Sequence, residues 1–307
     1  MLTRSIGTAL VLTAAVMALS GGGCSSSSGG GGGGLQIGQF TSWDDINPGE
    51  TVVINGNVVH ANYQTDLNTG FTNAGPTQSS AAEARLTYDN NSNLVRVDID
   101  AGGASVDFNE NQGDDIGLVF GNLVGGAISA NGEEIGLWAE PDGLGFNYQT
   151  FGVWLTGYNT GAGVAAAGSF GARTPDANVP GAGVLTYNGA ASGFAVDAAG
   201  IPFLVISSSE VVVDFGGGTF TFVTTGSLKD NLVDASEFTF VGDPNFNLIG
   251  NGDIVANSLE GNVAAAGYNL AGDVDAWLYG VDASEVGGLF DLVGADGRYV
   301  GSFGAVD

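Results

Sequence analysis

The sequence is poor in cysteine, histidine and basic residues, and each shortage excludes a class of protein. Its 307 residues contain one cysteine, so no disulfide can form within the chain, and packing and hydrogen bonds must hold the fold together. Six Lys and Arg residues stand against 33 Asp and Glu, and the formal net charge is −27. Such a chain repels nucleic acid and anionic headgroups, so we expect no nucleic-acid partner. Because the acids are spread along the chain, adaptation to salty water accounts for them better than a dedicated basic partner does.

Catalysis is hard to build from these residues. The only histidine, His60, would have to be the base of any Ser-His-Asp triad, and the chain has no G-x-S-x-G motif. We therefore expect no enzyme activity, no catalytic residue and no cofactor. If the protein binds haem, His60 is the only histidine that can ligate the iron, which makes it a candidate ligand-binding residue. The alternative is a structural histidine at a strand end, whose hydrogen bonds are satisfied by a neighbouring group.

One loop resembles part of a calcium site. Residues 243–247 place side-chain oxygens at the first, third and fifth positions of a calcium-binding loop. However, Leu248 and Ile254 stand where an EF-hand needs Gly and Glu. Solvated turns are the ordinary role of such Asp and Asn residues, so we expect no metal site.

Long apolar runs are missing after the first 23 residues, so no later segment is predicted to cross a membrane as a helix. At the start, Arg4, an apolar stretch at 6–19 and several small residues are typical of a cleaved signal peptide, residues 1–23. Cys24 follows and resembles the lipobox cysteine of bacterial lipoproteins. This resemblance implies that Cys24 carries acyl chains such as palmitate, which anchor the protein to a membrane.

The residues after Cys24 complete the predicted anchor. Residues 24–38 are rich in Ser and Gly and are predicted to form a flexible tether. Serine directly after the cysteine resembles the outer-membrane sorting signal of Gram-negative bacteria, so we expect an outer-membrane, cell-surface location. The alternative is an ordinary signal peptide followed by a free thiol.

Glycine is abundant, with 54 residues, and it separates short runs of Val, Phe, Thr and Ile. This pattern predicts a mainly β protein with many tight turns and no long helix. Hairpin turns are predicted at four places: Asn55-Gly56, 89–93, Asn188-Gly189 and the glycines at 216–218.

The alternation of apolar and polar residues is clearest after a linker predicted at 175–180. There, Val211, Val213 and Phe215 are predicted to face the same side as Phe220 and Phe222 of the next strand. Eight to ten strands at about ten-residue spacing predict a closed antiparallel barrel. Because the outer face carries Asp, Thr and Ser, we expect a barrel surrounded by water.

Several segments together resemble the transferrin-binding protein B-like surface lipoproteins. The segments are 151–154, 172–175, 179–193, 213–215, 279–290 and 298–304. The resemblance implies a β-rich handle domain at 39–177 and a soluble eight-stranded antiparallel β-barrel at 178–307. It also implies non-enzymatic binding outside the cell.

Two aromatic residues near the end of the chain are candidates for ligand binding. In one register of the strand 273–279, Trp277 and Tyr279 face outward and would suit a protein interface. The opposite register buries both. Glu285, in the turn that follows, is expected to accept hydrogen bonds from backbone amides of that turn.

Taken together, these features predict a lipid-anchored surface lipoprotein that binds an extracellular protein or takes up iron, haem or another solute. The alternative is a structural or adhesive surface lipoprotein that has no small-molecule ligand.

Overall fold

The structure is a computed structural model that describes residues 37–66, 70–73, 75, 77–119, 122–158, 160–232 and 239–307. The predicted signal peptide, Cys24 and the predicted tether up to residue 36 lie outside the described residues. The first described element is β1 (Ile37–Gln39), at the end of the segment predicted to be tether. Within the described ranges, no helix is long and apolar enough to cross a membrane.

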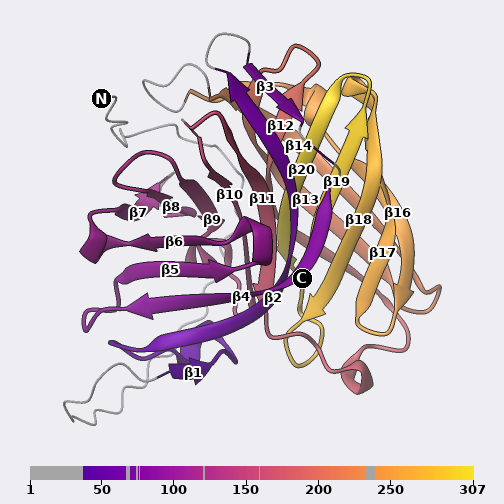
Figure 1. Ribbon diagram of the computed structural model, residues 1–307. Coiled ribbons are helices and arrows are strands. Elements are labelled where there is room, and N and C mark those ends of the chain that lie inside the picture. Colours follow the sequence, from indigo (N-terminus) through magenta and orange to yellow (C-terminus); the bar gives the residue numbers. More distant parts are fainter. Residues whose placement is uncertain are drawn as a thin grey trace.

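The N-terminal half of the chain forms one strongly curved sheet, which we call the handle (Figure 1). Its elements are β1, η1 (Trp43–Asp45), β2 (Thr51–Asp66), β3 (Gly70–Asn73), β4 (Gln78–Tyr88), β5 (Leu94–Asp100), η2 (Gly102–Ala104), β6 (Val106–Asn109), η3 (Glu110–Gln112), β7 (Asp115–Val119), β8 (Val124–Ile128), β9 (Ile135–Ala139), α1 (Pro141–Leu144), β10 (Gln149–Thr156) and β11 (Ala162–Gly171). Nine strands follow the order β6-β5-β4-β2-β11-β10-β9-β8-β7, while β1 and β3 both pair with β2. The two ends of the row, β6 and β7, are consecutive in the chain, and the sheet curls until it is nearly closed.

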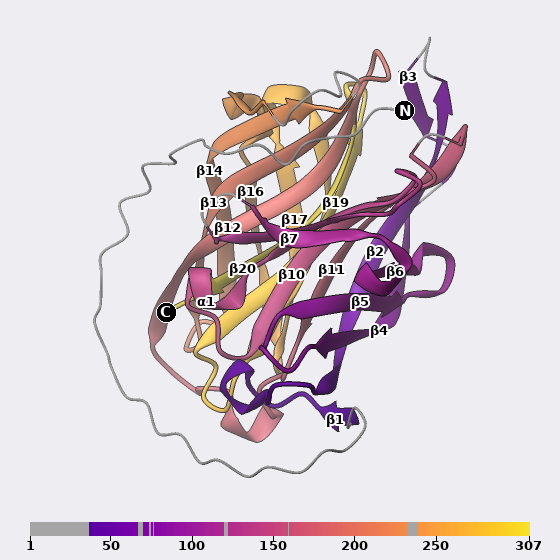
Figure 2. The same ribbon diagram turned by 90° about the vertical axis from the view of Figure 1, so that its left-hand side faces the viewer.

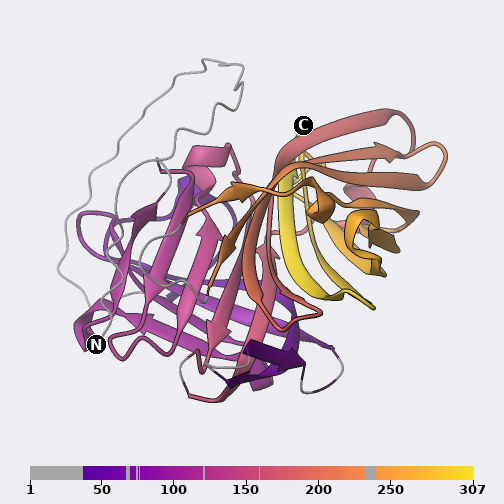
Figure 3. The ribbon, with the colours of Figure 1, turned by 90° about the horizontal axis from the view of Figure 1, so that it is seen from above.

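The C-terminal half forms a closed antiparallel barrel, seen end-on in Figure 3. Its elements, after η4 (Asp176–Asn178), are β12 (Val184–Asp197), β13 (Pro202–Asp214), β14 (Thr219–Asn231), β15 (Val241–Gly242), η5 (Pro244–Phe246), β16 (Ile249–Val255), β17 (Ser258–Ala265), η6 (Ala266–Tyr268), β18 (Leu270–Tyr279), β19 (Glu285–Gly294) and β20 (Gly297–Val306). Pairing of β13 with β14 closes the eight long strands into a ring, and β15 adds to β14 outside it. The predicted fold class, a β-rich handle followed by an eight-stranded antiparallel barrel, is confirmed.

The barrel interior is filled by the apolar residues that alternate along its strands. Val211 pairs with Phe222 and Val213 with Phe220, and all four side chains are buried, as their alternation predicts. Phe222 also stacks on Phe303 of β20 with a ring-centroid distance of 4.2 Å. The barrel interior is therefore packed with side chains.

The hairpin turn predicted at Asn55-Gly56 is wrong, because both residues lie inside the 16-residue strand β2. Gly56 pairs with Ala82 on one side and with Phe170 on the other. A Cβ atom on Gly56 would come within 2.3 Å of the Ser169 carbonyl oxygen. The glycine therefore allows close approach of the neighbouring strand instead of a turn.

The turn predicted at Asn188-Gly189 is wrong for the same reason. Both residues lie in the middle of β12, where Gly189 pairs with Ala305 of β20. A Cβ atom there would lie 2.0 Å from the Gly304 carbonyl oxygen. The other two predicted turns, at 89–93 and 216–218, do connect paired strands, β4 with β5 and β13 with β14.

The convex face of the handle packs against the wall of the barrel (Figure 2). Alternate side chains of β2, β10 and β11 point to this interface, and the intervening ones point into the concave side of the handle. The buried interface includes Val59, Ala61, Val153, Leu155, Ala165 and Ala167 from the handle, and Phe194, Leu204, Trp277, Tyr279, Leu289 and Val300 from the barrel. The barrel therefore covers the convex face of the handle at β2, β10 and β11, and the concave face lines a cavity.

Candidate functional site

The concave side of the handle encloses a cavity of about 650 Å³ that is open to solvent. Aromatic side chains from six elements line it: Trp43, Tyr88, Phe108, Trp138, Trp154 and Phe170. Aliphatic side chains complete the lining, among them Ile46, Ile54, Leu86, Leu94, Val97, Ile116 and Leu118. A concave apolar cavity of this size falls in the usual range for small-molecule sites.

Three of the four tryptophans in the chain line this cavity, and two of them are held by backbone hydrogen bonds. Trp43 opens η1, where the Ser42 hydroxyl accepts a hydrogen bond from the backbone N–H of Asp44. The Trp43 indole N–H donates to the Gln149 carbonyl at 2.8 Å, and that of Trp154 donates to the Ala104 carbonyl at 2.7 Å. With their polar atoms satisfied, these rings offer apolar faces to a ligand.

Glycines bring the other aromatic rings close to the sheet. A Cβ atom on Gly125 of β8 would overlap the Trp138 indole, and one on Gly136 of β9 would lie 2.8 Å from the Phe108 ring. Phe108 belongs to β6, so its contact with β9 joins opposite sides of the curled sheet. Small residues at these positions therefore set the curvature and the depth of the cavity.

All charged side chains that line the cavity are acidic. They are Asp89, Glu110, Glu140 and Asp142. Asp89 is occupied by its own turn, since it accepts hydrogen bonds from the backbone N–H groups of Asn91 and Asn93. Glu140 lies at the end of β9, and burial, together with the nearby charge of Asp142, raises its pKa. Hydrogen bonding from Trp138 opposes that rise. The mouth of the cavity is therefore a region of negative potential next to aromatic rings.

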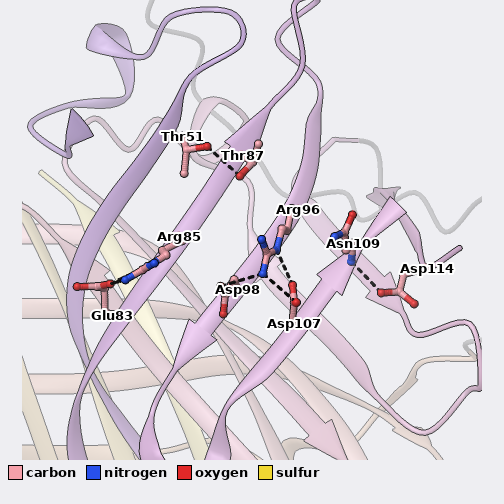
Figure 4. Close-up of polar contacts among 9 residues, drawn as sticks. All are labelled: Thr51, Glu83, Arg85, Thr87, Arg96, Asp98, Asp107, Asn109 and Asp114. Carbon is pink, nitrogen blue, oxygen red and sulfur yellow. Dashed lines mark hydrogen bonds and ion pairs between the residues drawn. The ribbon is translucent and has the colours of Figure 1, made fainter. Parts of the chain in front are cut away.

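The arginines of the handle lie on the opposite face of the sheet. Figure 4 shows the pairing of Arg85 with Glu83 and of Arg96 with Asp107. Arg85 Nη2 lies 2.7 Å from Glu83 Oε1, and Arg96 Nε lies 2.7 Å from Asp107 Oδ1. Arg96 also donates to Asp98 at 3.1 Å. These outer-face pairs hold the arginine side chains away from the cavity, and none of the described basic residues lines it.

His60, the candidate haem ligand, lies on β2 beside η2 and outside the cavity lining. Its side chain is only 4% exposed, and a Cβ atom on Gly103 of η2 would lie 3.5 Å from its Nε2. Burial lowers its pKa, so the imidazole is held neutral. No hydrogen-bond partner of Nδ1 is found in the part of the chain that the structure describes. A haem could reach the imidazole only if residues that cover it moved, because His60 is almost fully buried.

Trp277 and Tyr279 face outward from the barrel, with Val274, Ala276 and Leu278 inside it. They are nevertheless buried, 9% and 0% exposed, because the handle covers them. The Arg173 guanidinium lies 4.3 Å from the centre of the Trp277 ring, and the Tyr279 hydroxyl is 2.9 Å from that of Ser169. Both residues therefore join the two domains, and an external partner cannot contact them in this arrangement.

Glu285 also joins the domains. Its carboxylate accepts hydrogen bonds from the backbone N–H groups of Asn147 and Tyr148 at 2.6 and 3.1 Å. The acceptor role was predicted, but the donors belong to the handle and not to the turn that contains Glu285. Burial raises the pKa of Glu285 to about 7, although these hydrogen bonds lower it.

The loop that resembles part of a calcium site is held by other interactions. Asp243 pairs with Lys229 at 2.7 Å and accepts a hydrogen bond from the Tyr268 hydroxyl at 2.6 Å. Among the residues that the structure describes, no group of three or more His, Cys, Asp or Glu side chains is arranged to hold a metal ion.

No protein-family model matches this sequence, and no curated protein matches it. Among solved structures, the chain is similar to a double mutant of transferrin binding protein B from Haemophilus parasuis, with a TM-score of 0.45 and 11% identity over 85% of this chain and 76% of that one. It is also similar to a structure described as a surface lipoprotein, with a TM-score of 0.44 and 12% identity over 81% of this chain and 98% of that one. A third similar structure is transferrin binding protein B from serogroup B Neisseria meningitidis. Its TM-score is 0.41, and it is 11% identical over 84% of this chain and 77% of that one.

The handle and the barrel themselves are established by the strand pairings of this chain.

Sequence reasoning missed the cavity and the acids at its mouth. Trp43, Trp138, Trp154 and Glu140 were not predicted to belong to a site. A local signal is the Trp-x-Glu spacing of 138 and 140, which would put both side chains on one face if the strand continued to 140. That spacing does not reveal that the face is concave, because curvature depends on strand pairing far away in sequence.

Proposed function

We propose that this protein is a lipid-anchored lipoprotein of the outer-membrane surface that captures an extracellular partner or nutrient without chemical conversion. The observation that carries the proposal is the open aromatic cavity of the handle, which has the size and lining of a binding site. The signal-like N-terminus with Cys24 and its Ser/Gly tether supports the anchor. The partner classes implied by the sequence resemblance are an extracellular protein and an iron- or haem-type nutrient.

Anchoring is tested on intact cells. We expect antibody or protease to reach the protein on cells that carry the natural chain, whereas Cys24→Ser leaves it unattached and releases it from the membrane fraction. Retention of the Cys24→Ser protein in the membrane at the natural level would contradict lipid anchoring.

Capture is tested separately with the purified chain. Haem is titrated and followed by absorbance, ferric complexes are titrated by calorimetry, and His60→Ala serves as the control for iron ligation. A saturable haem spectrum that disappears in His60→Ala would establish haem capture and make His60 the iron ligand.

Absence of binding to every iron source would remove iron and haem from the proposal. If cells that lack the protein then lose attachment to surfaces but keep normal solute uptake, the structural or adhesive alternative replaces capture.

A further inference from the structure

The distribution of charge around the handle cavity is one-sided. Every Lys and Arg side chain in the described residues has a partner outside the cavity; Arg4 lies outside the described residues. The pairs are Arg85 with Glu83, Arg96 with Asp98 and Asp107, Arg173 with Asn57 and Trp277, Lys229 with Asp243, and Arg298 with Asp291. The cavity lining, in contrast, holds four acids and three tryptophans. A ligand that suits this cavity must therefore match both an apolar aromatic surface and a negative mouth.

We propose that the handle cavity binds amphipathic organic cations, which combine an apolar body with an ammonium or similar group. This inference rests on the proposed capture function and names the ligand class of the same site. The apolar body lies against Trp154, Phe108 and the aliphatic lining, and the cationic group lies at the mouth near Glu140 and Trp138.

The tryptophans contribute to this selectivity as well as to apolar contact. A cation over an indole face is attracted by the negative charge of the ring surface, and tryptophan is the strongest aromatic partner for this interaction. Trp138 lines the cavity with its ring packed over Gly125, and Glu140, directly after β9, lines it too and interacts with Trp138. An aromatic face and a carboxylate next to each other form a site that favours a cation.

Glu140 is the acid best placed to anchor the cation. Asp89 is already occupied by its turn, whereas no side-chain ion pair is found for Glu140 within the described part of the chain. The raised pKa of Glu140 agrees with a half-buried carboxylate that lacks a positive partner. A bound cation would supply that partner and favour the ionised form.

The same charges disfavour anionic ligands. A fatty acid or the propionates of haem would place a carboxylate at a mouth that already holds Glu140, Asp142 and Glu110. Like charges repel, and screening by solvent is weaker beside the half-buried Glu140 than at the exposed acids. We therefore expect selection by charge and not only by apolar surface.

Three probes with the same ten-carbon chain test this proposal: decyltrimethylammonium and decanoate below their micelle concentrations, and decanol below its solubility limit. They are titrated by calorimetry and by tryptophan fluorescence into the Cys24→Ser chain, which carries no lipid of its own. We expect decyltrimethylammonium to bind saturably and roughly tenfold more tightly than decanoate, with decanol between them and with the difference reduced by salt.

Two variants that remove one negative charge each locate the site. Glu140→Gln should reduce the preference for the ammonium probe over decanol several-fold. Glu260→Gln, at an exposed position on the barrel wall, should leave that preference unchanged. Circular dichroism of both variants checks that they fold.

Each outcome has a defined meaning. Decanoate binding as tightly as the ammonium probe would overturn the charge selectivity, while leaving the cavity a ligand site. Equal effects of the two variants would place the cation elsewhere on the acidic surface and overturn the assignment. If no probe binds, the cavity is not a site for this ligand class, and the cell-surface and iron experiments above still test the proposed function independently.

Discussion

At the residue scale, the carboxyl group of Glu285, buried between the two domains, makes the free energy of unfolding depend on pH. Glu285 is nearly fully buried and holds the backbone N–H groups of Asn147 and Tyr148, residues of the handle that are distant in sequence. Its pKa of about 7 in the folded protein lies above the ordinary value of 4.5. Between these two values, the folded state keeps a proton that the unfolded state has lost.

We therefore predict that Glu285 makes the protein more stable as pH falls from about 7 to about 4.5, and costs stability above that window. Glu285→Gln removes this dependence. The difference in the free energy of unfolding between about pH 5 and about pH 8 should shrink by roughly 3 kcal/mol in the variant, as measured by urea unfolding.

A matched control separates this effect from the general charge of the protein. Glu260→Gln removes one exposed acid from the barrel wall and should leave the pH dependence close to that of the natural chain. If Glu285→Gln and Glu260→Gln respond alike, the pH dependence belongs to the net charge and not to the buried carboxylate.

At the element scale, glycines inside strands set how closely neighbouring strands approach. Gly56 and Gly117 both lie in handle strands, but a Cβ atom on Gly56 would meet Ser169 and Phe170, whereas one on Gly117 would meet nothing within 4 Å. Gly56→Ala should therefore lower the free energy of unfolding by roughly 1–3 kcal/mol because of overpacking. Gly117→Ala should have little effect or a slightly stabilising one.

Urea or thermal unfolding of the two variants side by side measures this difference. If Gly117→Ala lowers the free energy of unfolding as much as Gly56→Ala does, glycine is needed in these strands for a reason other than the close approach of neighbouring strands.

At the scale of the whole molecule, the handle and the barrel are joined by one apolar interface with aromatic residues at its centre. Trp277 packs there under the Arg173 guanidinium, while the Tyr279 hydroxyl forms a hydrogen bond with that of Ser169. Trp277→Ala should lower the stability by roughly 3–5 kcal/mol because it leaves a large void between the domains.

Tyr279→Phe offers a milder change at the same interface. It removes one hydroxyl and leaves that of Ser169 buried without this partner, which costs roughly 1–3 kcal/mol. Unfolding is followed by fluorescence and by circular dichroism together. If Trp277→Ala costs no more than Tyr279→Phe, the interface contributes little to the stability of the whole chain.

The overall charge of −27 gives a second prediction at this scale. The folded chain brings many uncompensated acids together, so their repulsion opposes folding. Raising NaCl from about 0.05 M to about 1 M should increase the free energy of unfolding, since salt screens this repulsion. A decrease with salt, measured by thermal unfolding, would show instead that the few ion pairs dominate.

Local sequence patterns predict part of this architecture. The alternation of residues 211–215 with 219–223 predicts a hairpin with one apolar face, because side chains two apart always share a face of a strand. The same physics makes the barrel and the mainly β class predictable. It also placed Val274, Ala276 and Leu278 on the inside of the barrel in one of the two registers that the sequence left open.

The rest was decided only by tertiary structure. Asn55-Gly56 and Asn188-Gly189 carry a strong local turn signal, yet both lie inside strands because the neighbouring strand needs the space that glycine leaves. Trp277 is outward-facing and still buried, since only the docked handle determines what covers it.

The cavity, too, is decided by the tertiary structure. The sequence by itself determined the alternation of faces, the strand-rich class and the acidic charge, all of which depend on residues close together in the chain. The tertiary structure alone decided which face is concave, which acids meet there, and where the basic residues are engaged. These features depend on the pairing and curvature of strands that are far apart in sequence, and no local spacing encodes them.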